Sequence, residues 1–585
     1  MKYTRNALGL LNAQYRSVLK KCLLINLGLF ALGAGVSTAS AVTLSPTLDS
    51  LKEQAKDISP DVSYTLTKLD SGETLPEGAA KVTINKETYY FTPSSDKDLL
   101  QTLAGTSAGI ITSEGGTPKS ISFDVSKLPA SVFSYEIGTE NDHNFVVQEA
   151  DQDGNITKKY YKVVLNTDNM HTSPNISWEK VGADKKDETG VVAVNLPNKQ
   201  TEYYKYSYNQ PAGRTVYTSQ QTNLSGDVNA DFIGSSSSYY SSGGAIYNDE
   251  NGTIGSITGD FIGNNAIWSG GAINNYGFIG DITGDFIGNY GYYGGAIYNG
   301  YKGTIGDITG DFIGNYVSDI TTSSSAYARG GAIYNGYKGT IGDITGDFIG
   351  NYASSENKEA EGGAIYNGED GTIGNITGDF IGNYTNSYGG AIYNDRGTIG
   401  NITGDFIGNY SSAKSGTAKG GAIYNDRGTI GNITGDFIGN YISVSSEYGS
   451  AEGGVIYNNR GTIGNITGDF IGNYSSSYGG AIYNDGFIGD ITGDFIGNYS
   501  SYGGAIDNGG TIVDITGDFI GNYSSSYGGA ISNNWGTIGN ITGDFIGNYA
   551  YSDSENGKAQ GGAIYNYNKG TITIAGASTF TDNYV

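Results

Sequence analysis

The chain is 585 residues long, contains 94 glycines and carries a formal net charge of −26 at pH 7. A chain this acidic is repelled by the phosphate backbone, which excludes nucleic acid as a partner. The single cysteine, Cys22, lies near the start of the chain, so no disulfide framework can hold the fold together. Packing and hydrogen bonds must therefore supply the stability.

Residues 1–41 have the three parts of a secretory signal peptide. A basic segment precedes an apolar run at 23–35, and small residues at 39–41 form a cleavage site. A membrane-anchoring helix is the alternative, but Asn26 and Gly28 interrupt the apolar run, which is short for a bilayer. We therefore predict that the chain is exported.

Residues 42–225 are predicted to form a β-rich N-terminal region of one or two small modules. Alternating apolar and polar residues occur at 81–91, 145–149, 158–165 and 203–208, between segments rich in Gly, Asn, Asp and Pro. All nine prolines lie at or before Pro211. This change of composition predicts a domain boundary between residues 215 and 230.

From residue 226 to residue 585 the chain repeats one unit, which reads GGAIYN, a short turn, GTIG-x-ITGDFIGN and tyrosine. Its phenylalanines recur every 24 to 36 residues. A period of this size is typical of solenoids, in which each unit buries its apolar side chains only against its neighbours. The phenylalanines are Phe232, Phe261, Phe286, Phe312, Phe348, Phe380, Phe406, Phe437, Phe470, Phe495, Phe519, Phe545 and, in a degenerate copy, Phe580.

The residue types of the repeat favour strands over helices. Ile, Thr, Tyr and Phe suit strands, whereas each interior glycine costs a helix about 1 kcal/mol. Leucine-rich repeats are excluded because no leucine follows Leu224. Disorder is excluded because Ala, Ile and Phe recur at fixed offsets. We predict an all-β fold, a parallel β-helix of about twelve coils, with strands at AIYN, TIGxI and DFIGN.

The tyrosine after FIGN opens the segment in which the repeat varies most in length. Insertions at 317–329, 353–361, 411–419, 442–452 and 550–560 all leave the coil at this corner. Loops on a rigid scaffold often carry binding, and tyrosine is enriched in interfaces. The corner is therefore either a recognition surface or a simple stack of tyrosine on tyrosine. The tyrosines are Tyr290, Tyr316, Tyr352, Tyr384, Tyr410, Tyr441, Tyr474, Tyr499, Tyr523 and Tyr549.

The sequence predicts no catalytic, cofactor or metal site. The aspartate of ITGDF recurs in each unit, and we expect it to cap a turn through its own backbone, with its charge in water; a cation-binding ladder is the alternative. Residues 105–109 spell GxSxG, but a nucleophile elbow needs a large α/β sheet that this chain lacks. Near-identical units offer no unique catalytic constellation, so we expect no enzyme.

The alternation of GGA[I/V] with FxxN, as at 295–297 and 312–315, extends over residues 232–585. This pattern resembles the passenger repeats of the polymorphic outer-membrane protein family, which includes chlamydial autotransporter adhesins. The resemblance implies a signal peptide, a β-helical passenger and a C-terminal membrane barrel. Because Val585 ends the last repeat, we expect that barrel to lie outside this chain. The alternative is that the chain is secreted and held at the surface in another way.

The resemblance also implies a function. We expect a bacterial cell-surface adhesin, located at the outer membrane or outside the cell, that binds a host-cell or bacterial surface receptor, either protein or glycan. The alternatives are a β-helical enzyme that acts on polysaccharide and a structural surface-layer rod.

Overall fold

The structure is a computed structural model. It describes residues 224–237 and 242–585, apart from 319–326, 356–358, 415, 447–448, 553–557, 577, 582 and 584. Between residues 64 and 217 it describes separate strands and the short 3-10 helix η3 (Ala183–Lys185). The predicted signal peptide at 1–41 and the GxSxG motif, except its last glycine, lie outside the described residues. No helix among the described residues has the length and apolar character needed to span a membrane.

The N-terminal region is β-rich, as predicted. Its described strands form small antiparallel sheets ordered β1-β3-β2, β6-β8-β7 and β10-β11-β9, and the pair β4-β5. The run at 81–91 is two strands rather than one. The strands are β1 (Tyr64–Lys68), β2 (Ala80–Ile84), β3 (Glu87–Pro93), β4 (Gly109–Glu114), β5 (Thr117–Phe123), β6 (Phe133–Ile137), β7 (Phe145–Ala150), β8 (Ile156–Leu165), β9 (Ile176–Val181), β10 (Val191–Asn195) and β11 (Thr201–Tyr208).

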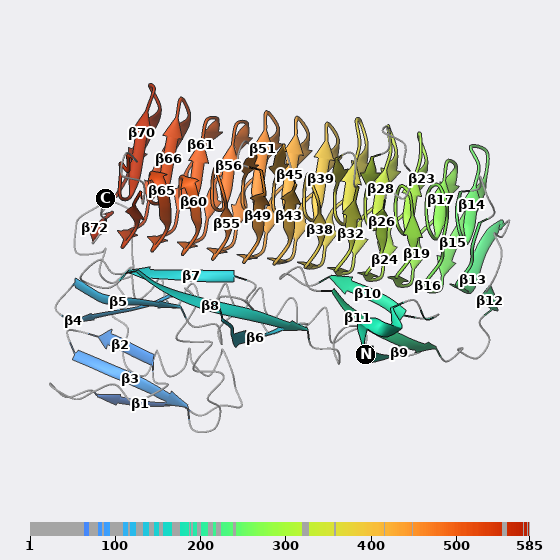
Figure 1. Ribbon diagram of the computed structural model, residues 1–585, viewed down its shortest axis with the longest axis horizontal. Coiled ribbons are helices and arrows are strands. Elements are labelled where there is room, and N and C mark those ends of the chain that lie inside the picture. Colours follow the sequence, from blue (N-terminus) through green and yellow to red (C-terminus); the bar gives the residue numbers. More distant parts are fainter. Residues whose placement is uncertain are drawn as a thin grey trace, which may run out of the picture. The chain divides into compact units, whose positions relative to one another are not determined.

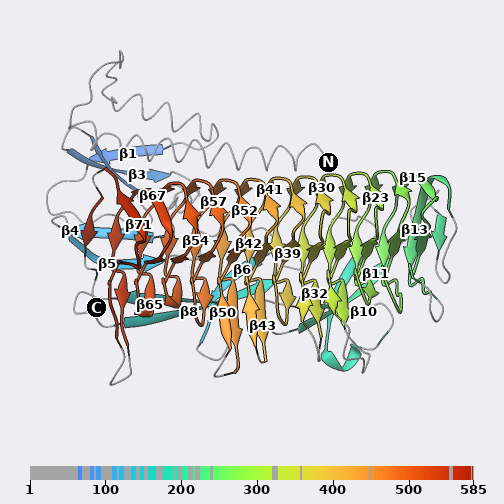
Figure 2. The ribbon, with the colours of Figure 1, turned by 90° about the horizontal axis from the view of Figure 1, so that it is seen from above.

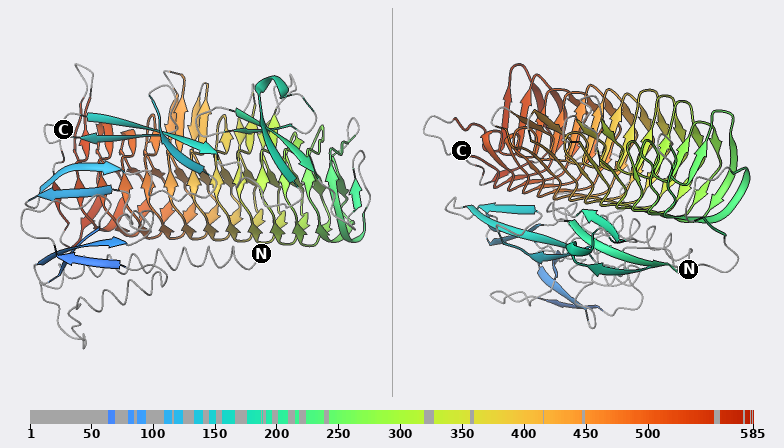
Figure 3. Two further views of the ribbon diagram at one scale, coloured as in Figure 1. Left: turned by 90° about the horizontal axis from the view of Figure 1, so that it is seen from below. Right: turned by 45° about the vertical axis from the view of Figure 1, so that its right-hand side comes forward.

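The repeats form the predicted parallel β-helix, whose coils stack in register along one axis (Figure 1). The AIYN segments of the described chain build a twelve-stranded parallel sheet that runs from β14 (Ile246–Asn248) to β70 (Ile564–Tyr567). The end of the stack at β13 (Gly226–Ile233) pairs in parallel with β12 (Thr215–Tyr217). Figure 3 shows the successive coils in two further projections.

The TIGxI segment differs from the prediction because it usually forms two short strands. In one coil these are β23 (Thr304–Ile305) and β24 (Ile308–Thr309), followed by β25 (Phe312–Ile313). Between them the N–H of Asp307 donates to Oδ1 of Asp281 in the preceding coil, 3.0 Å away, instead of to a carbonyl. A side-chain oxygen thus takes the place of a backbone carbonyl in the ladder at this point.

The interior is a continuous stack of phenylalanine rings flanked by isoleucine and alanine. Neighbouring rings have centroids 4.4 to 5.3 Å apart and planes within 13° of parallel. Every DFIG phenylalanine of this stack from Phe232 to Phe545 is fully buried, whereas Phe580 at the end of the stack is 50% exposed. Burying one such side chain contributes roughly 1.5–3 kcal/mol. Because neighbouring coils carry the same ring at the same place, the rings pack directly against one another.

The asparagine of FIGN satisfies its whole hydrogen-bonding capacity through adjacent coils. Nδ2 of Asn409 donates to the Phe380 carbonyl at 2.8 Å and to Oδ1 of Asn440 at 3.1 Å. Its own Oδ1 accepts from the backbone N–H and Nδ2 of Asn383, at 3.0 and 2.9 Å. The asparagine of AIYN forms a second column, in which, for example, Asn394 donates to Asn425. Both columns need an identical residue in the next coil.

The two positions of GG in GGA each require glycine, but for different physical reasons. Gly362 has a φ of 68°, in the left-handed region that side chains disfavour. At Gly363 a Cβ atom would lie 1.9 Å from the carbonyl oxygen of Gly390 in the next coil. The motif therefore marks a corner at which one backbone crosses very close to another.

Candidate binding surface

The tyrosines that follow FIGN form a column along the stack, which we call the first tyrosine column. Ring centroids of Tyr316 and Tyr352 are 5.0 Å apart, and those of Tyr384 and Tyr410 are 4.4 Å apart. Burial raises the pKa of Tyr316 and of Tyr384. Much of each ring is thus covered by the rings above and below it. This agrees with the interpretation of the corner as a stack of tyrosine on tyrosine.

The insertions at this corner begin and end as strands, whereas the sequence predicted loops. The insertions at 317–329 and 353–361 occur in adjacent coils and form a first paired extension. Their outgoing strands β26 (Tyr316–Ser318) and β32 (Tyr352–Ser354) pair, as do their returning strands β27 (Ala328–Arg329) and β33 (Ala360–Glu361). Val317, Ala328, Ala353 and Ala360 form a small separate core and are fully buried.

A second paired extension joins the insertions at 411–419 and 442–452. Strand β43 (Tyr410–Ala413) pairs with β49 (Tyr441–Val444), and β44 (Thr417–Lys419) pairs with β50 (Ser450–Glu452). Figure 2 shows β43 and β50 reaching beyond the neighbouring coils. Each extension is stable because the next coil carries an insertion that supplies the pairing partner. The described residues Ala413, Ala418, Ile442 and Ala451 form its core.

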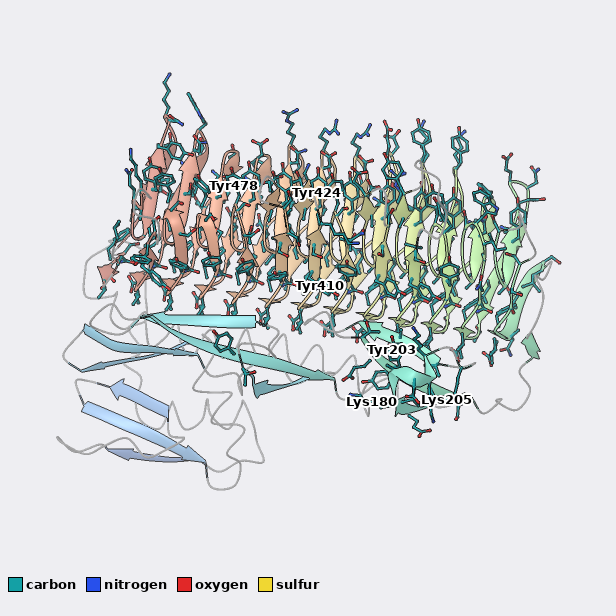
Figure 4. The ribbon with its side chains drawn as sticks, viewed as in Figure 1. Lys180, Tyr203, Lys205, Tyr410, Tyr424 and Tyr478 are labelled. Carbon is teal, nitrogen blue, oxygen red and sulfur yellow. The ribbon has the colours of Figure 1, made fainter. Side chains whose placement is uncertain are left out.

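The tyrosine of AIYN forms a second tyrosine column, to which the sequence analysis gave no role. Neighbouring rings have centroids 4.8 to 5.4 Å apart. The column could have been predicted from the sequence, because this tyrosine recurs directly after a buried isoleucine. Alternate residues of a strand point to opposite faces, so the tyrosines share the outer face. Figure 4 shows that Tyr424 of this column lies at a different level of the coil from Tyr410 of the first column. Its unbroken run consists of Tyr298, Tyr334, Tyr366, Tyr393, Tyr424, Tyr457 and Tyr483.

The residue before each GG forms a third column, which we call the flanking column. It bridges from coil to coil and contacts the second tyrosine column, as the 5.6 Å separation of the Tyr478 and Tyr483 ring centroids shows. Unlike the other columns it mixes aromatic and charged residues. From Ser269 onward its members are Ser269, Tyr293, Arg329, Glu361, Tyr388, Lys419, Glu452, Tyr478, Tyr502, Tyr527 and Gln560.

Lys419 of the flanking column lies among three tyrosine rings. Its Nζ is 5.4 Å from the ring centroid of Tyr388, 5.1 Å from that of Tyr424 and 5.5 Å from that of Tyr457. Burial raises the pKa of Glu452 in the next coil, and the positive charge of Lys419 partly offsets the rise. A cation over aromatic faces gains roughly 0.5–2 kcal/mol, so the rings and the carboxylate together hold an ammonium group.

Arg329 and Glu361 form an ion pair in the flanking column. The guanidinium lies 4.6 Å from the ring centroid of Tyr327 and 4.9 Å from that of Tyr366. Burial raises the pKa of Glu361 to about 7, although Arg329 opposes the shift. The face made by the second tyrosine column and the flanking column can thus accommodate cations where a carboxylate is nearby.

The aspartates of ITGDF do not behave as predicted. Oδ1 of Asp260 accepts the backbone N–H of Asp285, the aspartate one coil on, at 3.1 Å, whereas the prediction placed such a bond within the same turn. Asp260 and Asp285 are only 5% and 4% exposed, so their charges do not lie freely in water. Burial and the negative charge of Asp494 raise the pKa of Asp518 to about 6. In the described residues no group of three or more His, Cys, Asp or Glu is arranged to hold a metal ion.

These features define a β-solenoid repeat protein whose longest insertions leave the coil at one corner. Residues 468–485, which run from the glycine of ITGDF through the next GGAIYN, match the family described as Chlamydia polymorphic membrane protein repeat. The repeat of this chain is thus of the polymorphic membrane protein type, as its resemblance indicated, on the strength of one matched unit. No curated protein and no solved structure matches the chain.

Proposed function

We propose that this chain is the passenger of a bacterial cell-surface autotransporter and that it attaches to other cells through its two paired extensions. The repeat type supports a place at the outer membrane or cell surface. The observation that carries the proposal is that long insertions occur in adjacent coils, where they stabilise each other. A scaffold of near-identical coils with two extensions, whose described strands pair between adjacent coils, is suited to binding rather than to catalysis.

The partner we propose is a receptor on a host cell or on a neighbouring bacterium, either protein or glycan. The two extensions differ in sequence, so they need not bind the same feature of that receptor. Two sites on one rigid scaffold gain affinity when both engage at once, because the second binding step is intramolecular.

The test shortens the extensions without disturbing the coils. Residues 411–418 and 442–451 are each replaced by Thr-Asn-Ser, the segment that joins Tyr384 to Tyr388 in a coil without an insertion. Lys419 and Glu452 stay in place, so the flanking column is unchanged. The same replacement of 317–328 and 353–360 removes the first paired extension.

We expect beads coated with the full chain to adhere to epithelial or bacterial cells, and the doubly shortened chain to lose most of that adherence. The matched control replaces Ser475, Ser476 and Ser477 by Thr-Asn-Ser, which changes the same corner of a coil that has no insertion. Undiminished adherence of a folded, doubly shortened chain would contradict the proposal and favour a structural rod.

A further inference from the structure

The second tyrosine column is interrupted in two successive coils. Asp507 stands in register with Tyr483 of the preceding coil, and Ser532 stands in register with Asp507. The column resumes at Tyr565, which pairs with Ser532. Two aromatic rings are thus replaced by a carboxylate and a hydroxyl.

Tyrosines of the flanking column bypass the interruption. The Tyr478 ring lies 5.6 Å from Tyr483 and 5.0 Å from Tyr502. Tyr502 continues to Tyr527 at 5.5 Å, and Tyr527 reaches Tyr565 at 4.7 Å, each distance joining ring centroids. The aromatic path therefore passes around Asp507 and Ser532. Both stay buried, with 6% and 0% of their surface exposed.

The buried carboxylate of Asp507 has the Ser532 hydroxyl beside it, but among the described residues it has no cation. Ser532 Oγ has no hydrogen bond of acceptable geometry, although it is close enough to lower the pKa of Asp507. In the described part of the chain Asp507 makes no ion pair, unlike Glu361 with Arg329. A buried carboxylate without a cation costs several kcal/mol.

Negative charge and aromatic rings surround the interruption. The charge of Asp507 contributes to the raised pKa of Tyr478 and of Tyr483, after burial as the main cause in both. Asp485 and Glu452 add to the shift at Tyr483. This part of the face thus combines acidic groups with ring faces, and the residues that the structure describes supply no cation to it.

The chain itself shows what such surroundings hold. At Lys419 three tyrosine rings and the carboxylate of Glu452 surround an ammonium group that the chain supplies. At Asp507 the rings and the carboxylate recur, but no lysine does. The hydroxyl of Ser532 adds an acceptor without a donor.

We propose that the interruption at Asp507 and Ser532 is a binding site for a primary alkylammonium group. The ammonium ion pairs with the Asp507 carboxylate and donates a hydrogen bond to Ser532 Oγ, and its alkyl chain lies against the rings of Tyr478 and Tyr502. Entry requires the partly exposed rings of Tyr502 and Tyr527 to turn outward. The site lies in coils without long insertions, so it is independent of the attachment proposed above.

The test titrates the full chain with n-butylammonium chloride at constant ionic strength and follows binding by calorimetry. We expect saturable binding to one site, weakened at least about tenfold in Asp507→Asn, because a hydrogen bond to a charged group contributes that much or more. Tetramethylammonium cannot donate a hydrogen bond to Ser532 and should bind more weakly than butylammonium.

Asp507→Tyr is a control that separates loss of the site from loss of the fold. It restores the residue found in register in the preceding coil, so the stack should continue, the protein should fold and the site should be filled. Asp485→Asn leaves the interruption intact and should retain binding. Equal affinity of the unchanged chain, Asp507→Asn and Asp507→Tyr, or tighter binding of tetramethylammonium, would overturn the assignment.

Discussion

The asparagine columns and the second tyrosine column run along the same coils but tolerate change very differently. Asparagine of AIYN is retained from Asn248 to Asn566, and each donates to the next. The second tyrosine column is broken at Asn274, Asp507 and Ser532. A buried amide that serves three neighbouring groups cannot be replaced without leaving them unsatisfied. A ring of the second tyrosine column can be replaced because tyrosines of the flanking column, such as Tyr478 and Tyr502, continue the aromatic contacts around the gap.

The largest effect should come from a glycine in the GG corner. In Gly390→Ala the new Cβ would lie 1.9 Å from the carbonyl oxygen of Gly421, and the backbone cannot move away without breaking the coil. We expect a loss of more than about 3 kcal/mol of stability, measured by urea unfolding. Gly509→Ala, where the nearest atom is 3.4 Å away, should be nearly neutral. Equal losses in both would show that the close approach is not the cause.

Asn409→Ala should have the next largest effect. It removes the partners of the Phe380 carbonyl and of the Asn383 N–H, which stay buried. At about 1–3 kcal/mol for each orphaned group, we expect a loss of roughly 2–4 kcal/mol and faster amide exchange in the adjoining coils. Asn401→Ala is the control, because Asn401 is exposed and water can replace its bonds. A similar loss in the control would remove the distinction between buried and exposed columns.

Asp507 should make stability depend on pH. Burial raises its pKa from 3.8 to about 7, so the folded chain binds the proton more tightly than the unfolded chain. The stabilisation of the folded chain that comes from this tighter proton binding is complete below about pH 4. It is lost as the pH rises toward 7. Asp507→Asn should therefore be the more stable protein above pH 7, by about 1–3 kcal/mol, with a flatter pH profile of the melting temperature. Parallel profiles would contradict the burial of this charge.

The smallest effect is expected at Lys419. Lys419→Gln removes the cation from three rings and from Glu452, and should cost about 1 kcal/mol in thermal unfolding. Lys419→Arg keeps the charge and should recover most of the loss. If the glutamine and arginine variants are equally stable, the tyrosine rings do not stabilise the side chain at position 419 through its positive charge.

The sequence was sufficient to predict the coil because the coil depends on residues that repeat. Phenylalanine, isoleucine and the GG pair recur at fixed offsets, and each finds its own copy one coil away. The division of TIGxI at Asp307 was missed because the bond from Asp281 joins residues 26 apart and leaves no local signal. The same holds for the Asp260 bond to the next coil.

Less of the candidate binding surface than of the coil could be predicted from the sequence. The insertions were located correctly, but their strands depend on whether the adjacent coil also carries an insertion. The role of Lys419 requires Tyr388, Tyr424 and Tyr457 to converge from separate coils. Such contacts follow from the exact register of the stack, which the repeat pattern alone does not fix.

The asparagine amides have a further consequence, because all of them point the same way. In both columns Nδ2 of one coil donates to Oδ1 of the coil that follows it. Amide dipoles aligned in this manner add along the axis. The rod is therefore electrically polar, with opposite partial charges at its two ends, and any coil joined to it must enter head to tail.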